Sequence, residues 1–140
     1  MKITIITIAY NSAEGIGRTI ESVLAQEQGD IPYTMEYLVI DGASSDDTVA
    51  IAESYIPAME SRGIDYRISS EPDGGIYDAM NKGIRRATGD IIGILNSGDW
   101  YEPVAARTAA DTFADTGCGI NINLLKRLEV RARWSPIPKA

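Results

Sequence analysis

Short apolar runs recur along the first 116 residues and are separated by segments of mixed polarity. Three of them, KITIITIAY (2–10), MEYLVIDGAS (35–44) and DIIGILN (90–96), each contain a cluster of Ile, Val or Leu. Continuous apolar runs of this length are typical of strands that are buried on both faces, as in a parallel sheet. The run IDYRISSE (64–71) is more polar, and we expect it to form a weaker strand near an edge of the sheet.

Between these strands, apolar side chains recur at helical spacing. The expected helices lie within residues 11–28, 44–63, 76–87 and 102–114. Pro57 should kink or loosen the second helix, because proline lacks a backbone N–H and clashes with the preceding turn.

Polar residues precede the first two helices. Either Asn11 or Ser12 can cap the first helix, with Glu14 in its first turn, where the helix dipole favours an anion. At the second helix, Asp46 and Asp47 are interpreted as first-turn charges on a solvated helix.

The regular alternation of strands and helices predicts an α/β domain over residues 1–116. Its sheet should be mainly parallel, with right-handed crossovers and helices on both faces. The pattern fails in residues 117–140, which begin with a candidate fifth strand and then become basic and rich in proline. Two interpretations stay open: a divergent or truncated C-terminal tail, or an ordinary solvated helix and tail.

Composition excludes several classes of function. A net charge of −7 argues against a general nucleic-acid partner, which needs a basic surface. The absence of histidine excludes Ser-His-Asp and Cys-His catalysis and a histidine-built zinc site. The single Cys118 fits a reducing compartment, and no run approaches the ~20 apolar residues of a membrane span.

The expected location is therefore the cytoplasm, with the inner face of the membrane as an alternative. That alternative depends on the basic tail, since residues 117–140 hold 5 of the 13 Lys and Arg residues but 1 of the 20 acidic ones. Trp134 lies among these cations, but without a clear amphipathic pattern they support a peripheral membrane contact only weakly.

Carboxylates follow three of the four expected strands, in the loops at 41–45, 70–75 and 96–99. In an open parallel sheet, ligands bind beyond the carboxyl ends of the strands, so these loops should meet at one edge. Neither a G-x-G-x-x-G fingerprint nor a P-loop follows the first strand. A carboxylate-rich edge can instead hold a diphosphate through a divalent cation, Mg²⁺ or Mn²⁺, since both prefer oxygen ligands.

Four motifs resemble the nucleotide-binding half of family 2 glycosyltransferases: ITIAYNS, YLVIDGASSDDT, EPDGGIYDAMNKGIRRATGD and GILNSGDWYEP. The resemblance covers residues 2–116 in order and spacing, and is closest to bacterial members that build exopolysaccharide and other surface glycans. It implies a Rossmann-like GT-A fold that binds a nucleotide-sugar and transfers the sugar with inversion. The implied partners are a UDP-sugar and a glycan or lipid-linked acceptor.

The resemblance also assigns roles to individual residues. Ala9 and Tyr10 would line the pocket of the nucleotide base, and Asp41 would hydrogen-bond the base or the ribose. Asp73 and Gly74 would border the sugar-diphosphate. A structural alternative for Asp41 is a cap that accepts a backbone N–H in its own turn.

Two positions depart from the family pattern. Gly42 stands where the family often has the second of two aspartates, and the D-x-D motif reads Asn96-Ser97-Gly98, followed by Asp99. The resemblance makes Asp99 the expected metal ligand and Asn96 a ribose ligand through its amide.

On the third helix, Asp78, Asn81 and Lys82 share one face because they are three and four residues apart. Asn81 and Lys82 could point toward the phosphates or the sugar of the nucleotide-sugar. The alternative is a surface ion pair between Asp78 and Lys82.

Two other functions stay open. A non-catalytic nucleotide-binding or interaction module derived from a glycosyltransferase would explain Gly42 and Gly98. A nucleotidyltransferase would need a glycine-rich, basic loop after the first strand, which the sequence lacks.

Inverting sugar transfer needs a general base that deprotonates the acceptor hydroxyl. In the family, the base is a carboxylate well after D-x-D, but Glu129 is the one acidic residue beyond Asp115 and lacks a family-like context. We therefore expect the 140-residue chain to bind nucleotide and metal but to transfer sugar poorly. Robust transfer to an acceptor in a radiolabelled-sugar assay would contradict this.

Overall fold

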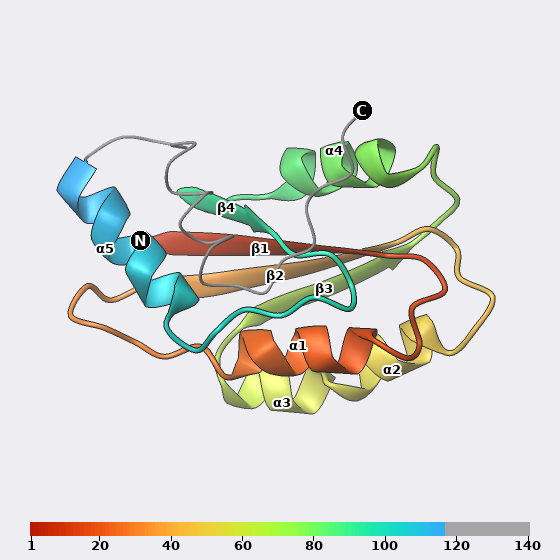
Figure 1. Cartoon of the computed structure of the whole chain (residues 1–140), viewed down its shortest axis with the longest axis horizontal. Coiled ribbons are helices and arrows are strands. Elements are labelled where there is room, and N and C mark those ends of the chain that lie inside the picture. The colour runs from red at the N-terminus through yellow and green to blue at the C-terminus, as the bar shows by residue number, and fades with distance from the viewer. Residues whose placement is uncertain (117–140) are drawn as a thin grey trace.

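The computed structural model describes residues 1–116, which form one parallel sheet flanked by helices (Figure 1). Along the chain the elements are β1 (Lys2–Ala9), α1 (Ile16–Leu24), β2 (Thr34–Asp41), α2 (Thr48–Ser54), α3 (Ile56–Ser61), β3 (Asp65–Ser70), α4 (Ile76–Arg86), β4 (Ile91–Ile94) and α5 (Ala105–Thr116). The predicted C-terminal tail and fifth strand lie outside the described residues. In the part of the chain that the structure describes, no helix is long and apolar enough to cross a membrane.

The sheet has the strand order β3-β2-β1-β4, and every pairing is parallel. β1 pairs with β2 over its whole length, so Ala9 lies level with Asp41. β2 pairs in turn with β3, which brings Ser70 level with Asp41. The parallel sheet and the edge position of the polar third strand are thus confirmed, and three strand ends meet at one edge.

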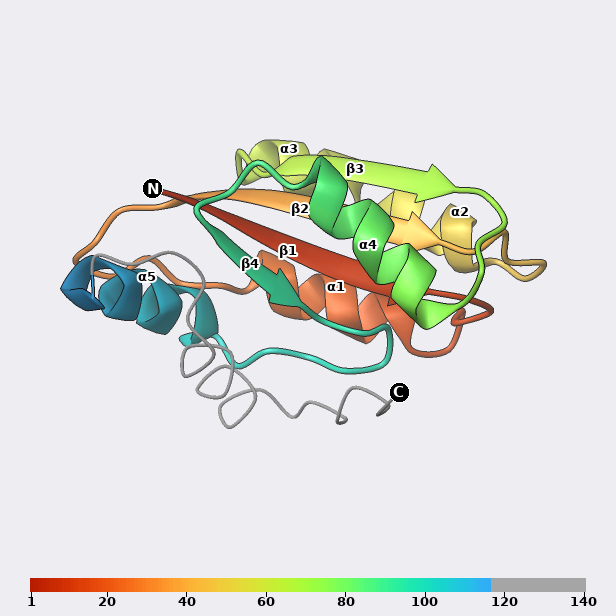
Figure 2. The ribbon, with the colours of Figure 1, turned by 90° about the horizontal axis from the view of Figure 1, so that it is seen from above.

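Both faces of the sheet are covered, which explains the continuous apolar runs. α1, α2 and α3 cover one face, and α4 covers the other, over β1 and β2 (Figures 1 and 2). Neighbouring residues of a strand point to opposite faces, so Ile5 packs in the core beneath α1 while Ile6 packs against α4. The predicted arrangement of helices on both faces is confirmed.

The expected helix between 44 and 63 is divided into α2 and α3, and Pro57 occupies the first turn of α3. Proline is accepted there because the N–H that it lacks would have no partner in a first turn. The prediction that Pro57 interrupts this helix is confirmed.

The predicted start of the first helix is wrong. α1 begins at Ile16 with Gly15 as its N-cap residue and no side-chain cap, so Glu14 lies before its first turn. The main-chain oxygen of Ser12 accepts the N–H groups of Gly15 and Ile16 instead. The side chains of Asn11 and Ser12 are used by neighbouring loops, as described below.

A buried carboxylate closes the end of the sheet opposite the strand ends that hold Ala9 and Asp41. Glu36 on β2 is 1% exposed and accepts hydrogen bonds from the Thr4 hydroxyl at 2.8 Å and the Thr88 N–H at 2.9 Å. The Thr88 hydroxyl donates to its second oxygen at 3.0 Å. Burial alone would raise the pKa of Glu36, but these hydrogen bonds together hold that pKa below its usual value.

This geometry predicts how stability depends on pH. Because the folded-state pKa of Glu36 is lowered, its contribution is fully present above the unfolded pKa of about 4.3 and is lost as pH falls through the folded pKa. Glu36→Gln should lower the free energy of unfolding at pH 7 by about 1–3 kcal/mol, because the oxygen that accepts the Thr88 hydroxyl becomes an NH2 group and the remaining hydrogen bonds lose their charged acceptor. The variant should also make the free energy of unfolding, measured with urea, depend less on pH below about 4.3. Glu60→Gln, at an exposed position of α3, is the control and should change neither quantity; equal behaviour of the two variants would contradict the prediction.

Candidate functional site

A cavity of about 580 Å³ opens at the edge of the sheet where the four strands end. Its wall is built from the end of β1 with the following loop, from the turn after β2, from the β3–α4 loop and from the turn after β4. The lining residues are Ile8, Ala9, Tyr10, Ser12, Gly42, Pro72, Asp73, Gly75, Ile76, Asn96 and Ser97.

The structure divides the predicted site residues into two groups. Ala9, Tyr10, Asp73 and Asn96 line the cavity, and Tyr10 is 64% exposed, which leaves its ring accessible for stacking. The residues that do not line it are Asp41, Gly74, Asn81, Lys82 and Asp99.

Asp41 is 1% exposed and has partners within the protein. Its carboxylate accepts the Ser44 N–H at 2.9 Å, the Ser44 hydroxyl at 2.6 Å and the Ser70 hydroxyl at 2.7 Å. Asp41 therefore joins the turn after β2 to the end of β3. Its hydrogen bond from the Ser44 N–H matches the structural alternative, a cap that accepts a backbone N–H in its own turn. Its contact with a base or ribose stays a prediction.

Gly42 allows Asp73 to lie close to the turn after β2. A Cβ at position 42 would come within 2.8 Å of Asp73 Oδ2, whereas Asp73 Oδ1 accepts the Gly75 N–H at 3.0 Å. A second aspartate at position 42 would meet this carboxylate directly. The departure from paired aspartates thus leaves room for Asp73 at the cavity wall.

Hydrogen bonds between loops hold this edge together, and sequence reasoning missed them. Asn11, whose φ of 46° lies in the left-handed region, accepts the Ser45 N–H at 2.9 Å. Asp46 accepts the N–H groups of Ala13 at 3.2 Å and Thr48 at 3.0 Å. Hydrogen bonding, above all from the Thr48 hydroxyl, lowers the pKa of Asp46. Asp46 is therefore an exposed loop anchor that lies before α2, so its predicted place in the first turn of that helix is wrong; the Asp-x-Thr spacing was the available signal.

The turn after β4 is fixed against α1. The Thr19 hydroxyl donates to Asp99 O at 2.7 Å and accepts the Gly98 N–H at 2.8 Å. Gly98 has a φ of 95°, and a Cβ on Gly15 would approach its Cα to 2.9 Å. The Ser97 hydroxyl is 2.7 Å from that of Ser12, which joins this turn to the loop after β1.

Asn96 carries an unusual atom. Its Oδ1 is buried and, within residues 1–116, has no hydrogen-bond partner. A buried acceptor without a partner costs free energy, so its presence at a cavity wall indicates a place for a ligand that donates hydrogen bonds.

The cavity offers few ligands for a metal. Among residues 1–116, no group of three or more acidic, histidine or cysteine side chains could hold an ion. The cavity wall supplies Asn96 Oδ1 and the Asp73 carboxylate, while Asp99 is 8% exposed and lies outside the lining. A divalent cation at this edge would have to take most of its ligands from a bound anion, as Mg²⁺ commonly does.

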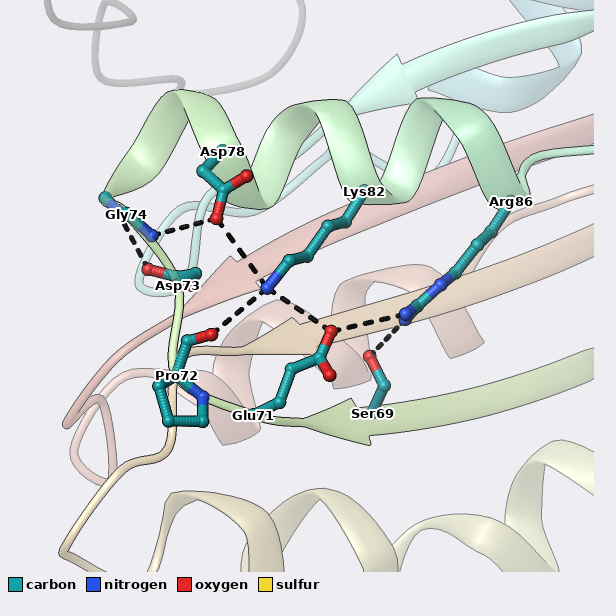
Figure 3. A network of polar contacts seen from close by, with 9 residues as sticks. Ser69, Glu71, Pro72, Asp73, Gly74, Asp78, Lys82 and Arg86 are labelled. Carbon is teal, nitrogen blue, oxygen red and sulfur yellow. Dashed lines mark hydrogen bonds and ion pairs between the residues drawn. The ribbon is translucent and has the colours of Figure 1, made fainter.

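Asn81 is exposed on α4, and Lys82 lies beside the loop before that helix (Figure 3). Lys82 Nζ is 3.7 Å from Asp78 Oδ2, so the ion pair considered from the sequence is present. The predicted contacts of both residues with a nucleotide-sugar stay predictions.

A family model described as glycosyl transferase family 2 matches residues 4–133. An uncharacterized glycosyltransferase of Mycobacterium tuberculosis is 42% identical over 117 residues, covering 82% of this chain and 41% of that protein. The succinoglycan biosynthesis protein ExoO of Rhizobium meliloti is 34% identical over 131 residues, covering 94% of this chain and 35% of that protein. The chain thus spans about two fifths of the curated relatives it matches.

Two solved structures share the fold. One is S. aureus TarS 1–349 in complex with UDP-GlcNAc, with a TM-score of 0.68 and 22% identity over 82% of this chain and 32% of TarS. The other is the mannosyltransferase PcManGT from Pyrobaculum calidifontis in complex with GDP-Man and Mn²⁺. Its TM-score is 0.67 at 20% identity, over 90% of this chain and 37% of that one. The Rossmann-like GT-A arrangement expected from the sequence is therefore confirmed.

The unpartnered Asn96 oxygen predicts a gain in stability when it is removed. Asn96→Leu keeps the side-chain size and should raise the free energy of unfolding of the ligand-free protein by about 1 kcal/mol, measured by urea unfolding. Ser97→Ala is the control and should lower it, because the hydrogen bond to Ser12 is lost. A destabilised Asn96→Leu variant would mean that Oδ1 already has a stabilising partner.

Proposed function

The chain belongs to glycosyl transferase family 2, and on that basis we propose that the cavity at the strand ends binds a nucleoside-diphosphate sugar, with a UDP-sugar as the first candidate. In the complete enzyme, the sugar would pass to a surface-glycan or lipid-linked acceptor with inversion at the anomeric carbon. Relatives named for succinoglycan biosynthesis and for PGL/p-HBAD biosynthesis support an acceptor of this kind.

The observation that carries the proposal is the buried, unpartnered Oδ1 of Asn96, a residue that lines the cavity. An unpartnered acceptor favours a ligand with hydroxyl groups, and a ribose offers two. Asp73, on the same wall, adds a second acceptor, and the exposed ring of Tyr10 suits stacking on a planar base. A volume of about 580 Å³ lies in the range of ordinary small-molecule sites.

The identity of the nucleotide is the finer part of the proposal. The two structural neighbours were solved with different nucleotide-sugars, UDP-GlcNAc and GDP-Man. The fold is therefore compatible with either base, and UDP and GDP have to be compared directly.

A divalent cation, Mn²⁺ or Mg²⁺, would offset the negative charge that develops on the departing nucleoside diphosphate. Asp99 is the residue proposed to hold it. Asn96, Asp73 and Tyr10 would bind and orient the nucleotide part. We assign the general base to no residue of the described part of the chain.

A second candidate function is the non-catalytic nucleotide-binding or interaction module. Gly98 in the D-x-D position and the place of Asp99 outside the cavity lining favour it, because they leave the wall with few metal ligands. If this module binds nucleotide, its binding should differ from that of the glycosyltransferase in not depending on metal.

We therefore predict that the chain binds UDP with a dissociation constant on the order of 10 μM in the presence of Mn²⁺, as measured by calorimetry. Binding should weaken in EDTA, and GDP should bind more weakly than UDP. Equal binding with and without metal would favour the non-catalytic module. An absence of binding of either nucleotide would refute the proposed function.

The same titration with Asp99→Asn examines the metal assignment. If Asp99 holds the cation, the variant should lose the stimulation by Mn²⁺ while its binding in EDTA stays unchanged. Asp111→Asn, at an exposed position of α5, is the matched control. Unchanged stimulation in Asp99→Asn would remove Asp99 from the site.

A further inference from the structure

The β3–α4 loop, residues 71–75, forms one wall of the cavity through Pro72, Asp73 and Gly75. It leaves β3, which is an edge strand of the described sheet, and it enters α4 at Gly75, where φ is 113°. A loop in this position has a neighbouring strand on one side at most. Its conformation therefore depends on contacts outside the sheet.

α4 provides a fixed support for such contacts. The helix lies close to β1, since a Cβ on Gly83 would come within 2.6 Å of Ile6 Cγ2. Ala79 and Met80 of the same helix are buried against Ile6 and Ile8. Side chains that project from α4 toward the loop are therefore attached to a helix whose position is fixed by packing against β1.

Lys82 reaches from α4 to the loop (Figure 3). Its Nζ donates to the main-chain oxygen of Pro72 at 3.2 Å and pairs with Glu71 Oε1 at 3.3 Å and Asp78 Oδ2 at 3.7 Å. The Lys82 side chain is 16% exposed. An ammonium group has three N–H donors, and three protein oxygens already surround this one.

Asp78 joins the same group of contacts. Its Oδ2 accepts the Gly74 N–H at 2.8 Å, and this hydrogen bond, followed by the nearby Lys82, lowers the pKa of Asp78. One helical turn beyond Lys82, Arg86 donates to the Ser69 hydroxyl at 2.7 Å and pairs with Glu71 at 3.4 Å. Residues at i, i+4 and i+8 of α4 thus follow the end of β3 and the loop (Figure 3).

We propose that Lys82 and Asp78 are positioning residues, which hold the 71–75 loop in the conformation that receives the ligand. This inference rests on the proposed function, because it concerns the same cavity, and it differs from a direct contact of Lys82 with the phosphates. Pro72 and Asp73 touch the ligand space, and Lys82 acts on it through them.

Two ligands separate the two roles, since uridine lacks the diphosphate that a phosphate-binding lysine would contact. If Lys82 positions the loop, Lys82→Met should weaken the binding of UDP and of uridine by the same factor, about five- to tenfold. If Lys82 binds phosphate, the same variant should weaken UDP alone. A loss confined to UDP would overturn the proposal.

Asp78→Ala, which removes the side-chain acceptor of the Gly74 N–H, gives a second, opposite test. A positioning role predicts that this variant weakens both ligands, as Lys82→Met does, because the loop loses its anchor at Gly74. A phosphate-binding lysine would bind UDP as well or better after a competing carboxylate is removed. Lys82→Arg should restore binding in the positioning role, since a guanidinium can still pair with Glu71 and Asp78.

Amide hydrogen exchange of the ligand-free chain measures how firmly the 71–75 loop is held when no nucleotide is bound. Lys82→Met and Asp78→Ala should each speed exchange at the Gly74 N–H about tenfold, whereas Arg85→Met, at an exposed position of the same helix, should not. Unchanged exchange in both variants would refute the positioning role. If the parent chain binds no nucleotide, the proposed function fails while this comparison still decides whether α4 holds the loop.

Discussion

The pairing of β1 with β2 along their full length is the constraint on which the cavity depends. Parallel pairing places Ala9 beside Asp41, and the next pairing brings Ser70 to the same level. Short hydrogen bonds can then join neighbouring segments, since the Ser45 N–H donates to Asn11 Oδ1 and the Ser70 hydroxyl donates to Asp41 Oδ2. The loops after β1 and β2 are thereby held together before a ligand arrives, which limits the entropy lost on binding.

The fold could be predicted from the sequence because it depends on local patterns, such as apolar runs and the position of a proline, that are visible along the chain. Ile5 and Ile6 belong to different core layers, and a strand with both faces buried has no polar alternation, so the apolar runs identified β1, β2 and β4. Pro57 marked the break between α2 and α3 because its effect is local. The start of α1 was not predictable in this way, since Asn11 has a typical capping side chain but uses it on a loop more than thirty residues away.

The candidate site was predicted in part, for the same physical reason. Strand ends of a parallel sheet share an edge, so Ala9, Tyr10, Asp73 and Asn96 could be assigned to one cavity from their place after strands. Helical spacing also identified the pair of Asp78 and Lys82. Contacts of these two with Gly74 and Pro72 depend on how α4 is set against β3, which spacing along the chain does not encode.

The close approach of position 42 to Asp73 has a consequence for how related chains can vary. The Asp73 carboxylate fills the space that a side chain at position 42 would enter, so the two positions share one volume. Two carboxylates there would also repel each other. A lineage that acquires an aspartate at position 42 should therefore lose the acid at position 73 or move its loop, and the two sites should evolve as a pair.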